Sequence, residues 1–250
     1  WASAQLSSLR GLMTGSSTIP AAYLQAFHDR GIPVGQIYGT TETGPVSIVS
    51  PFDQAVARMG STGWPQAEGQ VALRNEQGQS VAVGETGEVC IRAPNVMRGY
   101  WQADGRVGAG LQDGWFATGD LGQQAQDGCI TIVGRSKDMV ISGGENIYPA
   151  EIENLLVTLP GVAECAVVGM PDVRWGEVPV AVLVRTADAP GQALTPESVM
   201  QHLQNRIARF KLPRRLVWLD SLPKSALGKV QKPVLQAQLQ SLLRTGTAPT

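Results

Sequence analysis

The sequence predicts a mixed fold, α/β in its first part and α+β in its last part. Three observations predict it. A strand–helix–strand pattern occupies the first forty residues, and short strands separated by glycine turns run from about 60 to 133. Helices and strands then alternate from about 138 onward. The length of 250 residues suffices for one large domain or two smaller ones.

The first part contains a short amphipathic helix at residues 20–31. Pro20 suits a first-turn position and Gly31 a C-terminal cap. The apolar side chains on one face are Tyr23, Leu24 and Phe27. Short apolar stretches flank this helix at 9–13 and 33–39, and this β-α-β order is typical of a parallel sheet.

The middle part reads as a mostly antiparallel sheet or a small barrel. The predicted strands are 70–75, 87–93 and 128–134. The turn residues that separate them are Glu76-Gln77-Gly78, Asp113-Gly114 and Asp127-Gly128.

The last part is predicted to be an α+β module of about a hundred residues, joined to the rest at 134–138. Its predicted helices are 151–159, with Pro149 near the first turn, and 196–210, with Thr195 as N-cap and Pro196 at the first position. Its predicted strands are 162–170 and 178–185. The tail from 244 is expected to be frayed.

Composition excludes several classes of function. The net charge of −1 provides no broad basic face for nucleic acid or an anionic membrane. The three cysteines, Cys90, Cys129 and Cys165, form no metal-ligand pattern and favour a reducing, cytoplasmic compartment. The sequence shows no signal segment and no apolar run near eighteen residues. Because it begins at Trp1, we expect it to be part of something longer.

The sharpest local motif runs from Tyr38 to Pro45, with the sequence YGTTETGP. Gly39 would let a flat ring approach the backbone, and Thr41 can donate to a phosphate oxygen. Glu42 can hold Mg²⁺ bound to phosphates, since magnesium prefers one or two carboxylates plus phosphate oxygens. Taken alone, the motif is equally readable as a polar strand-to-loop turn.

Three weaker motifs follow. The carboxylate of Asp120, in Thr118-Gly119-Asp120, can accept from both hydroxyls of a ribose, although such a sequence alone is mostly a turn. Arg135 can donate two hydrogen bonds at once to ribose or phosphate oxygens. The two adjacent glycines Gly143-Gly144 allow bare backbone to line a narrow passage. Lys229, on a glycine-bearing loop, can stabilise oxygens that gain negative charge, although most loop lysines are simply solvated.

Together these motifs are far more specific. YGTTETGP, TGD, GRSKDMVISGGENIYPAEIE and PKSALGKVQK stand in the order found in the adenylate-forming superfamily, and the sequence resembles the C-terminal half of an AMP-forming acyl-CoA synthetase. The resemblance implies that residues 1–134 are the end of the large domain, with a βα sheet part at 1–58 and a β-rich, barrel-like subdomain at 59–134. Residues 135–250 would be the small mobile lid, with a hinge near 135–138.

The resemblance also implies a two-step ligase activity with ATP, Mg²⁺ and coenzyme A. Lys229 matches the lysine that bridges carboxylate and α-phosphate. Glu42 matches the magnesium-associated glutamate and Thr41 a phosphate contact. The resemblance implies that Asp120 and Arg135 bind the ribose and that Tyr38 stacks on adenine, with Gln36 and Gly39 nearby. It also implies that Gly15 and Ser16, in the small-residue loop Thr14-Gly15-Ser16-Ser17, lie next to the nucleotide. This loop does not contain the Ala-Pro sequence that is usual in the family.

The remaining assignments concern the lid and the acid. Lys137 matches the hinge residue, Gly143-Gly144 would line the pantetheine passage, and Asn146 would contact the nucleotide. The residues implied to line the acyl pocket are Thr40, Gly44, Pro45 and Val46. These residues suit a medium- or long-chain fatty acid or an aromatic acid better than a dicarboxylate. Phe210, Lys211, Arg214 and Arg215 form a positive patch that would meet coenzyme A phosphates or be a solvated helix end.

One family feature is missing: no Ser/Thr/Gly-rich phosphate loop followed by lysine occurs in 1–250. We therefore expect the chain alone to be inactive as a ligase. The expected partners are a small-molecule carboxylic acid and coenzyme A, not nucleic acid, with homodimer formation left open. The alternatives are an adenylation domain that loads a carrier protein, a non-catalytic nucleotide-binding module and a luciferase-like oxygenase.

Overall fold

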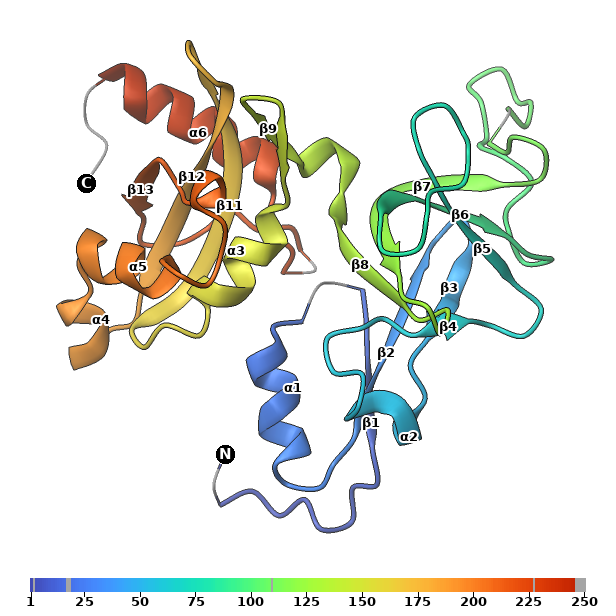
Figure 1. The fold of residues 1–250 in the computed structure, drawn as a ribbon, viewed down its shortest axis with the longest axis horizontal. Coiled ribbons are helices and arrows are strands. Elements are labelled where there is room, and N and C mark those ends of the chain that lie inside the picture. The colour runs from blue at the N-terminus through green and yellow to red at the C-terminus, as the bar shows by residue number, and fades with distance from the viewer. Residues whose placement is uncertain (2, 17–18, 109, 227, 246–250) are drawn as a thin grey trace. The chain divides into compact units, whose positions relative to one another are not determined.

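In a computed structural model, the chain divides into two compact units, Trp1–Ser136 and Lys137–Thr250 (Figure 1). The structure describes residues 1, 3–16, 19–108, 110–226 and 228–245. None of the helices in these ranges combines the length and apolar composition needed to cross a membrane.

The first unit begins with a four-stranded sheet in the order β1-β2-β3-β4. The strands are β1 (Leu12–Thr14), β2 (Val34–Thr40), β3 (Gly44–Val49) and β4 (Trp64–Pro65). The helices α1 (Ala21–His28) and α2 (Phe52–Ala55) lie beside β2 (Figure 1). The predicted β-α-β order is confirmed, because β1 and β2 pair in parallel. The prediction missed β3, which pairs antiparallel with β2.

A second sheet of the first unit has the antiparallel order β5-β6-β7-β8. Its strands are β5 (Gln70–Arg74), β6 (Thr86–Arg92), β7 (Phe116–Gln124) and β8 (Ile130–Arg135). In the described residues the ladder stays open, with β5 and β8 at its two ends, so the antiparallel-sheet reading holds and the small barrel does not form. The predicted turns form, with left-handed glycines at positions 78, 114 and 128.

One hydrophobic cluster joins the two sheets of the first unit. Ile48 of β3 packs with Val89 and Ile91 of β6 and Ile130 of β8, all with at most 1% exposure. An ion pair between Arg58 and Asp127 adds a link at the surface. The cluster holds β3, β6 and β8 together, and the strands that carry the candidate site, β2, β7 and β8, belong to the same two sheets.

The second unit is built on a mixed sheet of β9 (Val140–Ser142), β10 (Glu145–Ile147), β11 (Val162–Asp172), β12 (Gly176–Arg185) and β13 (Arg215–Trp218). Its helices are α3 (Pro149–Leu156), α4 (Ala189–Ala193), α5 (Pro196–Leu203) and α6 (Lys232–Thr245), and the 3₁₀ turns are Ser136–Asp138, at the boundary between the units, and Arg209–Lys211. The predicted strands are confirmed, and Pro149 lies in the first turn of α3 as expected, although this helix ends at Leu156 and not at 159.

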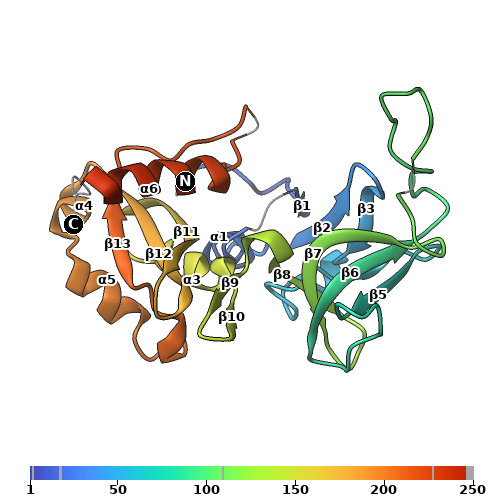
Figure 2. The ribbon, with the colours of Figure 1, turned by 90° about the horizontal axis from the view of Figure 1, so that it is seen from above.

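The central strands of this unit bury both faces. The helices α3 and α5 lie on one side of β11 and β12, and α6 lies on the other (Figure 2). Val167 and Leu183 pack toward α3 and α5, whereas Val168 and Val182 pack toward α6, as the two-residue period of a strand requires. The sequence prediction missed α6. It also extended the helix at 196–210 too far, because α5 ends at Leu203 and Asn205 adopts a left-handed φ of 67°.

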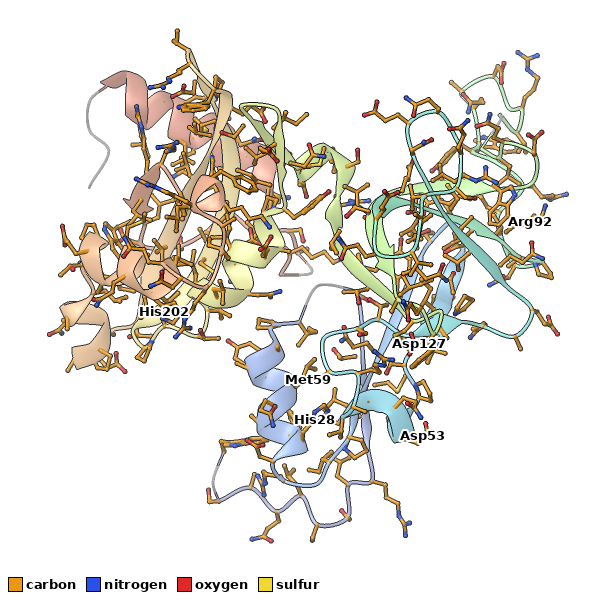
Figure 3. All side chains as sticks on the ribbon, viewed as in Figure 1. His28, Asp53, Met59, Arg92, Asp127 and His202 are labelled. Carbon is orange, nitrogen blue, oxygen red and sulfur yellow. The ribbon has the colours of Figure 1, made fainter. Side chains whose placement is uncertain are left out.

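Short contacts fasten the helices of the second unit to each other. The His202 ring on α5 reaches the end of α3, with Nε2 2.9 Å from the Leu155 carbonyl oxygen and 3.0 Å from the Thr158 hydroxyl (Figure 3). Thr195 caps α5 in a reciprocal pattern with Ser198. The unit therefore has its own core and its own polar connections.

Candidate active site

Three strands of the first unit meet at the carboxylate of Asp120. The Tyr38 hydroxyl on β2 donates to Asp120 Oδ2 over 2.7 Å, and Arg135 Nε on β8 donates to Oδ1 over 2.8 Å. The Asp120 side chain is only 12% exposed, whereas the Arg135 side chain is 49% exposed. An ionised carboxylate can accept about four hydrogen bonds, so Asp120 retains acceptor capacity for a ligand.

The backbone around Asp120 is fixed by its neighbours on β6 and β7. The buried Thr118 hydroxyl donates to the Val89 carbonyl over 2.8 Å and accepts from the Asp120 amide over 3.1 Å. The Gly119 amide donates to Glu88 Oε1 over 2.9 Å. The Thr118-Gly119-Asp120 motif therefore lies inside a strand with an irregular register, not in a free turn as its sequence suggested.

Tyr38 is held as a hydrogen-bond donor. Burial, and next the negative charge of Asp120, raise the pKa of the Tyr38 hydroxyl far above its ordinary value. The hydroxyl therefore keeps its proton throughout the physiological range and donates to Asp120. This contact places the edge of the Tyr38 ring beside the acidic group.

The turn between β2 and β3 is shaped by Thr43, which sequence reasoning passed over. Its hydroxyl accepts from the Thr40 amide and from the Ser47 hydroxyl, each over 3.0 Å, and its side chain is fully buried. Asn95 Nδ2 donates to the Thr43 carbonyl over 2.9 Å. This network orients residues 40–44, and the hydroxyl-rich composition of the motif was the signal that could have revealed it.

Glu42 lies in that turn and is contacted by a residue that the sequence prediction did not include. The Tyr100 hydroxyl donates to Glu42 Oε1 over 3.0 Å, and the Met97 amide donates to the Glu42 carbonyl over 2.7 Å. Hydrogen bonds from its own backbone amide, and then from the Thr40 and Tyr100 hydroxyls, together with the charge of Arg135, hold the pKa of Glu42 below its ordinary value.

These properties suit a magnesium-associated carboxylate. Among the described residues no group of three or more His, Cys, Asp or Glu side chains is arranged to hold a metal by itself. Glu42 would therefore supply one ionised carboxylate to Mg²⁺, with phosphate oxygens and water as the other ligands, and this is the donor set that magnesium prefers.

The small residues predicted around the nucleotide have close neighbours of their own. A Cβ at Gly15 would lie 2.5 Å from the Ile37 carbonyl oxygen, and one at Gly39 would lie 2.3 Å from that of Gly44. Both glycines are therefore required by the packing of the strands. Gln36 Nε2 donates to the Ser61 carbonyl over 2.9 Å.

Two exposed residues complete the predicted nucleotide set in this unit. Ser16 has a left-handed φ of 68°, which is uncommon for a residue other than glycine. Thr41 lies at the tip of the β2–β3 turn. Ser17 lies outside the described residues.

The residues predicted to contact the acid lie at the end of β2 and on β3. Thr40 and Gly44 are partners in the β2–β3 ladder, and Pro45 is exposed. Val46 lines a cavity of about 110 Å³ together with Ser47, Ile91 and Asn95, among others. Drug-sized ligands usually occupy about 300–1,000 Å³, so this cavity alone is too small for such an acid.

In the second unit, Gly143 and Gly144 form the two-residue turn between β9 and β10. Their φ angles of 62° and 88° identify a type I′ turn, which favours glycine at both positions. A Cβ at Gly143 would lie 2.7 Å from the Trp175 ring, and the Gly143 amide donates to the Trp175 carbonyl over 2.9 Å. Gly143 thus presents bare backbone beside an aromatic surface.

The residues of the predicted positive patch, Phe210, Lys211, Arg214 and Arg215, differ in their contacts, and Arg174 shares an aromatic neighbour with one of them. The guanidinium carbons of Arg174 and Arg214 lie 4.8 Å and 5.4 Å from the Trp175 ring centre, whereas Lys211 pairs with Glu151 over 2.7 Å. Phe210 and Lys211 lie in a 3₁₀ turn and Arg215 begins β13, so the patch does not lie at the end of the predicted helix 196–210, although Phe210, Arg214 and Arg215 are exposed as a solvated segment would be.

The other predicted residues of the second unit are exposed. Lys137 lies in the 3₁₀ turn Ser136–Asp138, and Asn146 lies on β10. Lys229 lies on a hairpin loop before α6, and Leu227 of the same loop is outside the described residues. The predicted site residues thus fall into two groups: one around Asp120 and the β2–β3 turn, and one on the loops of the second unit.

Comparison with known proteins decides the family. The model of the AMP-binding enzyme family matches residues 1–101, and the model of the AMP-binding enzyme C-terminal domain matches residues 151–229. The chain belongs to the adenylate-forming, AMP-binding enzymes. The family resemblance inferred from the four sequence motifs is therefore confirmed, and so is the mixed α/β character of the fold.

Several proteins with sequences similar to this chain are CoA ligases. The chain is 50% identical to an indoleacetate–CoA ligase of Aromatoleum aromaticum over 93% of this chain and 45% of the relative. It is 43% identical to a feruloyl-CoA synthase of an Amycolatopsis species over 93% of this chain and 47% of the relative. The chain thus spans about half the length of the curated relatives that it matches.

Solved structures that resemble this chain also include CoA ligases. An o-succinylbenzoate CoA synthetase from Bacillus subtilis, in complex with its acyl-adenylate, matches with a TM-score of 0.83 and 34% identity over 92% of this chain and 46% of that chain. An anthranilate CoA ligase in complex with anthranoyl-AMP matches with a TM-score of 0.85 and 31% identity over 95% of this chain and 46% of that chain.

Proposed function

We propose that this chain forms the nucleotide-binding and lysine-bearing half of an acid–CoA ligase. The parent enzyme would activate a carboxylic acid with ATP to an acyl-adenylate and pass the acyl group to coenzyme A. The observation that carries the proposal is the buried Asp120 carboxylate, held between Tyr38 and Arg135 beside the Glu42 turn.

In the proposed site, Asp120 accepts hydrogen bonds from the ribose hydroxyls. Its orientation is already set by Tyr38 and Arg135, so little ordering is required when the nucleotide binds. The Tyr38 ring provides the surface for adenine beside Gln36 and Gly39, and Gly15 and Ser16 lie at the end of the neighbouring parallel strand. Arg135 adds positive charge near the sugar and phosphate.

The β2–β3 turn would bind the phosphates. Thr41 donates to a phosphate oxygen, and Glu42 supplies a carboxylate to Mg²⁺. The metal would neutralise charge on the phosphates and hold them in place. Thr43 and Asn95 keep this turn in shape, and Tyr100 orients the Glu42 carboxylate.

We further propose that residues 1–134 belong to the large domain and that 135–250 form a lid that turns near 135–138. Lys137 lies in the 3₁₀ turn there, at the boundary of the two compact units. In one state Lys229 would bridge the carboxylate and the α-phosphate and Asn146 would contact the nucleotide. In the other, the Gly143-Gly144 turn would line the path of the coenzyme A thiol.

For the acid, we propose an aromatic carboxylic acid. Indoleacetate and ferulate are the acids named in the relatives at 50% and 43% identity. Thr40, Gly44, Pro45 and Val46 would line one side of its pocket, and their small or apolar side chains suit a flat ring. The remaining walls would come from the upstream half that the relatives possess.

The test of this proposal joins the chain to the N-terminal half that its relatives carry. Exchange of labelled pyrophosphate into ATP is measured with indoleacetate, ferulate, benzoate, octanoate and malonate, each with Mg²⁺. We expect exchange with one or more aromatic acids and thioester formation once coenzyme A is added. No exchange with any of these acids, from protein shown to be folded, would refute the ligase assignment. Octanoate as the best acid would refute only the aromatic preference.

The chain by itself is predicted to show no ligase activity, because its sequence contains no phosphate loop and the cavity beside Val46 is too small for the acid. The same pyrophosphate exchange assay with the 250-residue chain should give the background rate. Robust turnover by the chain alone would contradict this prediction and leave the family assignment unaffected.

A further inference from the structure

Lys229 lies on a short hairpin whose shape is fixed by backbone hydrogen bonds. Lys224 and Val230 form a β-bridge, the Ser225 amide donates to the Lys229 carbonyl over 2.8 Å, and the Gly228 amide donates to the Ser225 carbonyl over 2.9 Å. The Lys229 side chain is exposed. These backbone hydrogen bonds give the hairpin its form, and its place on the second unit depends on contacts near its two ends, among them the packing of Val230 against the cluster on the α6 side of the sheet.

Two ion pairs attach the two ends of this hairpin to the body of the second unit. Before it, Lys224 Nζ lies 2.7 Å from Glu164 Oε2 on β11. After it, at the first residue of α6, Lys232 Nζ lies 2.8 Å from Glu153 Oε1 on α3. Lys229 therefore lies between two lysines that are each paired with a glutamate of the core elements.

The Glu153 pair is the firmer of the two attachments. Its side chains are 20% and 24% exposed, compared with 39% and 34% for the Lys224–Glu164 pair. Glu153 Oε1 also accepts from the Val167 amide over 2.7 Å, so the carboxylate is fixed to the backbone of β11. Fully exposed ion pairs contribute little, whereas partly buried pairs with a shared backbone donor hold their geometry better.

We propose that Glu153, acting through Lys232, is a positioning residue for Lys229, with Glu164 and Lys224 as a weaker second attachment. This inference rests on the proposed function, in which Lys229 acts in acyl-adenylate formation and not in transfer to coenzyme A. A displacement of about 1 Å in a catalytic group can cost up to about a hundredfold in rate, so attachment at both ends of the hairpin matters for the first step.

The first test needs only the 250-residue chain. Amide hydrogen exchange is compared between the wild type, Glu153→Gln and Lys232→Met. Glu153→Gln keeps an oxygen for the Val167 amide but removes the charge that pairs with Lys232. We expect faster exchange at Ser225, Gly228 and Gln231, with unchanged protection in the centre of β12.

The matched control is Glu151→Gln on the same helix, which breaks the pair with Lys211 and leaves both hairpin attachments intact. It should leave exchange in the hairpin unchanged. Equal exchange in the hairpin for wild type and Glu153→Gln, or equal acceleration by Glu151→Gln, would overturn the proposal.

The second test separates the half-reactions in the chain joined to its upstream half. Glu153→Gln and Lys232→Met should slow acyl-adenylate formation about tenfold, while consumption of supplied acyl-adenylate by coenzyme A changes less than about twofold. Glu164→Gln should have a smaller effect on the first step, and Lys232→Arg, which keeps the charge, should retain most of the rate.

An equal loss in both half-reactions would show a general structural role and would overturn the positioning role. A wild-type protein that forms no acyl-adenylate with any acid would refute the proposed function, and the positioning role in catalysis with it. The exchange experiment would then still decide whether Glu153 holds the hairpin in place.

Discussion

The ionisation of Glu42 depends on contacts with residues that are distant in the sequence. Its carboxylate accepts from Tyr100, a residue more than fifty positions later in the chain, and lies close enough to Arg135 to be influenced by that charge. Each of these interactions favours the ionised form. Glu42 is thus kept negative in the pH range in which a magnesium-bound nucleotide would be present.

Replacing Tyr100 with Phe is predicted to raise the pKa of Glu42 toward its ordinary value of 4.5, because one donor to the carboxylate is lost. Since the folded-state pKa of Glu42 is depressed, its contribution to stability is present above the unfolded value and is lost as the pH falls through the folded value. The stability difference between wild type and variant should therefore shrink below about pH 4.5.

The measurement is a ¹³C NMR titration of the Glu42 carboxyl carbon in the chain. Tyr23→Phe, at an exposed tyrosine on α1, serves as the control and should leave the titration unchanged. An identical Glu42 titration in Tyr100→Phe and wild type would contradict the prediction.

At the scale of the elements, residues that are typical of helix starts located the helices better than the spacing of apolar residues did. Thr195 and Pro196 correctly mark the start of α5, and Pro149 correctly marks the start of α3. The end of α5 was placed seven residues too late, since the prediction ended at 210 and the helix ends at Leu203. Apolar Ile207 and Phe210 continue the pattern, while Asn205 turns the chain by adopting a left-handed conformation.

The Thr195 cap is predicted to stabilise the second unit by about 1 kcal/mol. Thr195→Ala should lower the free energy of unfolding by that amount, because the Ser198 amide loses its acceptor. Thr195→Ser keeps the hydroxyl and should remain close to wild type. Urea unfolding followed by circular dichroism measures both, and equal stability of Thr195→Ala and wild type would contradict the prediction.

The candidate site could be predicted only in part from the sequence, for a physical reason. Asp120 and Arg135 were recognised from motifs, and the structure joins them in an ion pair whose carboxylate also accepts a hydrogen bond from Tyr38. Thr43, Asn95 and Tyr100 were missed because their roles depend on contacts between segments more than fifty residues apart, or on complete burial of a hydroxyl. A local pattern carries no information about either.

At the scale of the whole molecule, the second unit has the features of an independent folding unit. Two hydrophobic clusters lie on the two faces of its sheet, and every residue of both clusters comes from the second unit. A domain of about a hundred residues with its own core commonly folds alone. A unit with its own core is also what the proposed lid would require in order to change its position as one body.

Residues 137–250 expressed alone are therefore predicted to fold and to unfold cooperatively in urea. The measurements are the dispersion of amide signals in the NMR spectrum and the urea unfolding curve. Leu183→Asp places a charge in the fully buried core and should abolish both the signal dispersion and the cooperative transition. A collapsed spectrum of the wild-type unit would show that it needs the first unit to fold.

Cys165 lies against the attachment of the Lys229 hairpin, and this has a consequence for chemical labelling. Burial, and next the charge of Glu153, raise the pKa of its thiol to about 12, so almost none of it is thiolate at neutral pH. Cys90, in the first unit, has its pKa raised chiefly by burial. Alkylation by iodoacetamide should therefore be slow at both thiols and become fast only where a unit opens. Mass spectrometry of the modified peptides would then time the opening of each unit separately, within the same molecule and with its native cysteines as reporters.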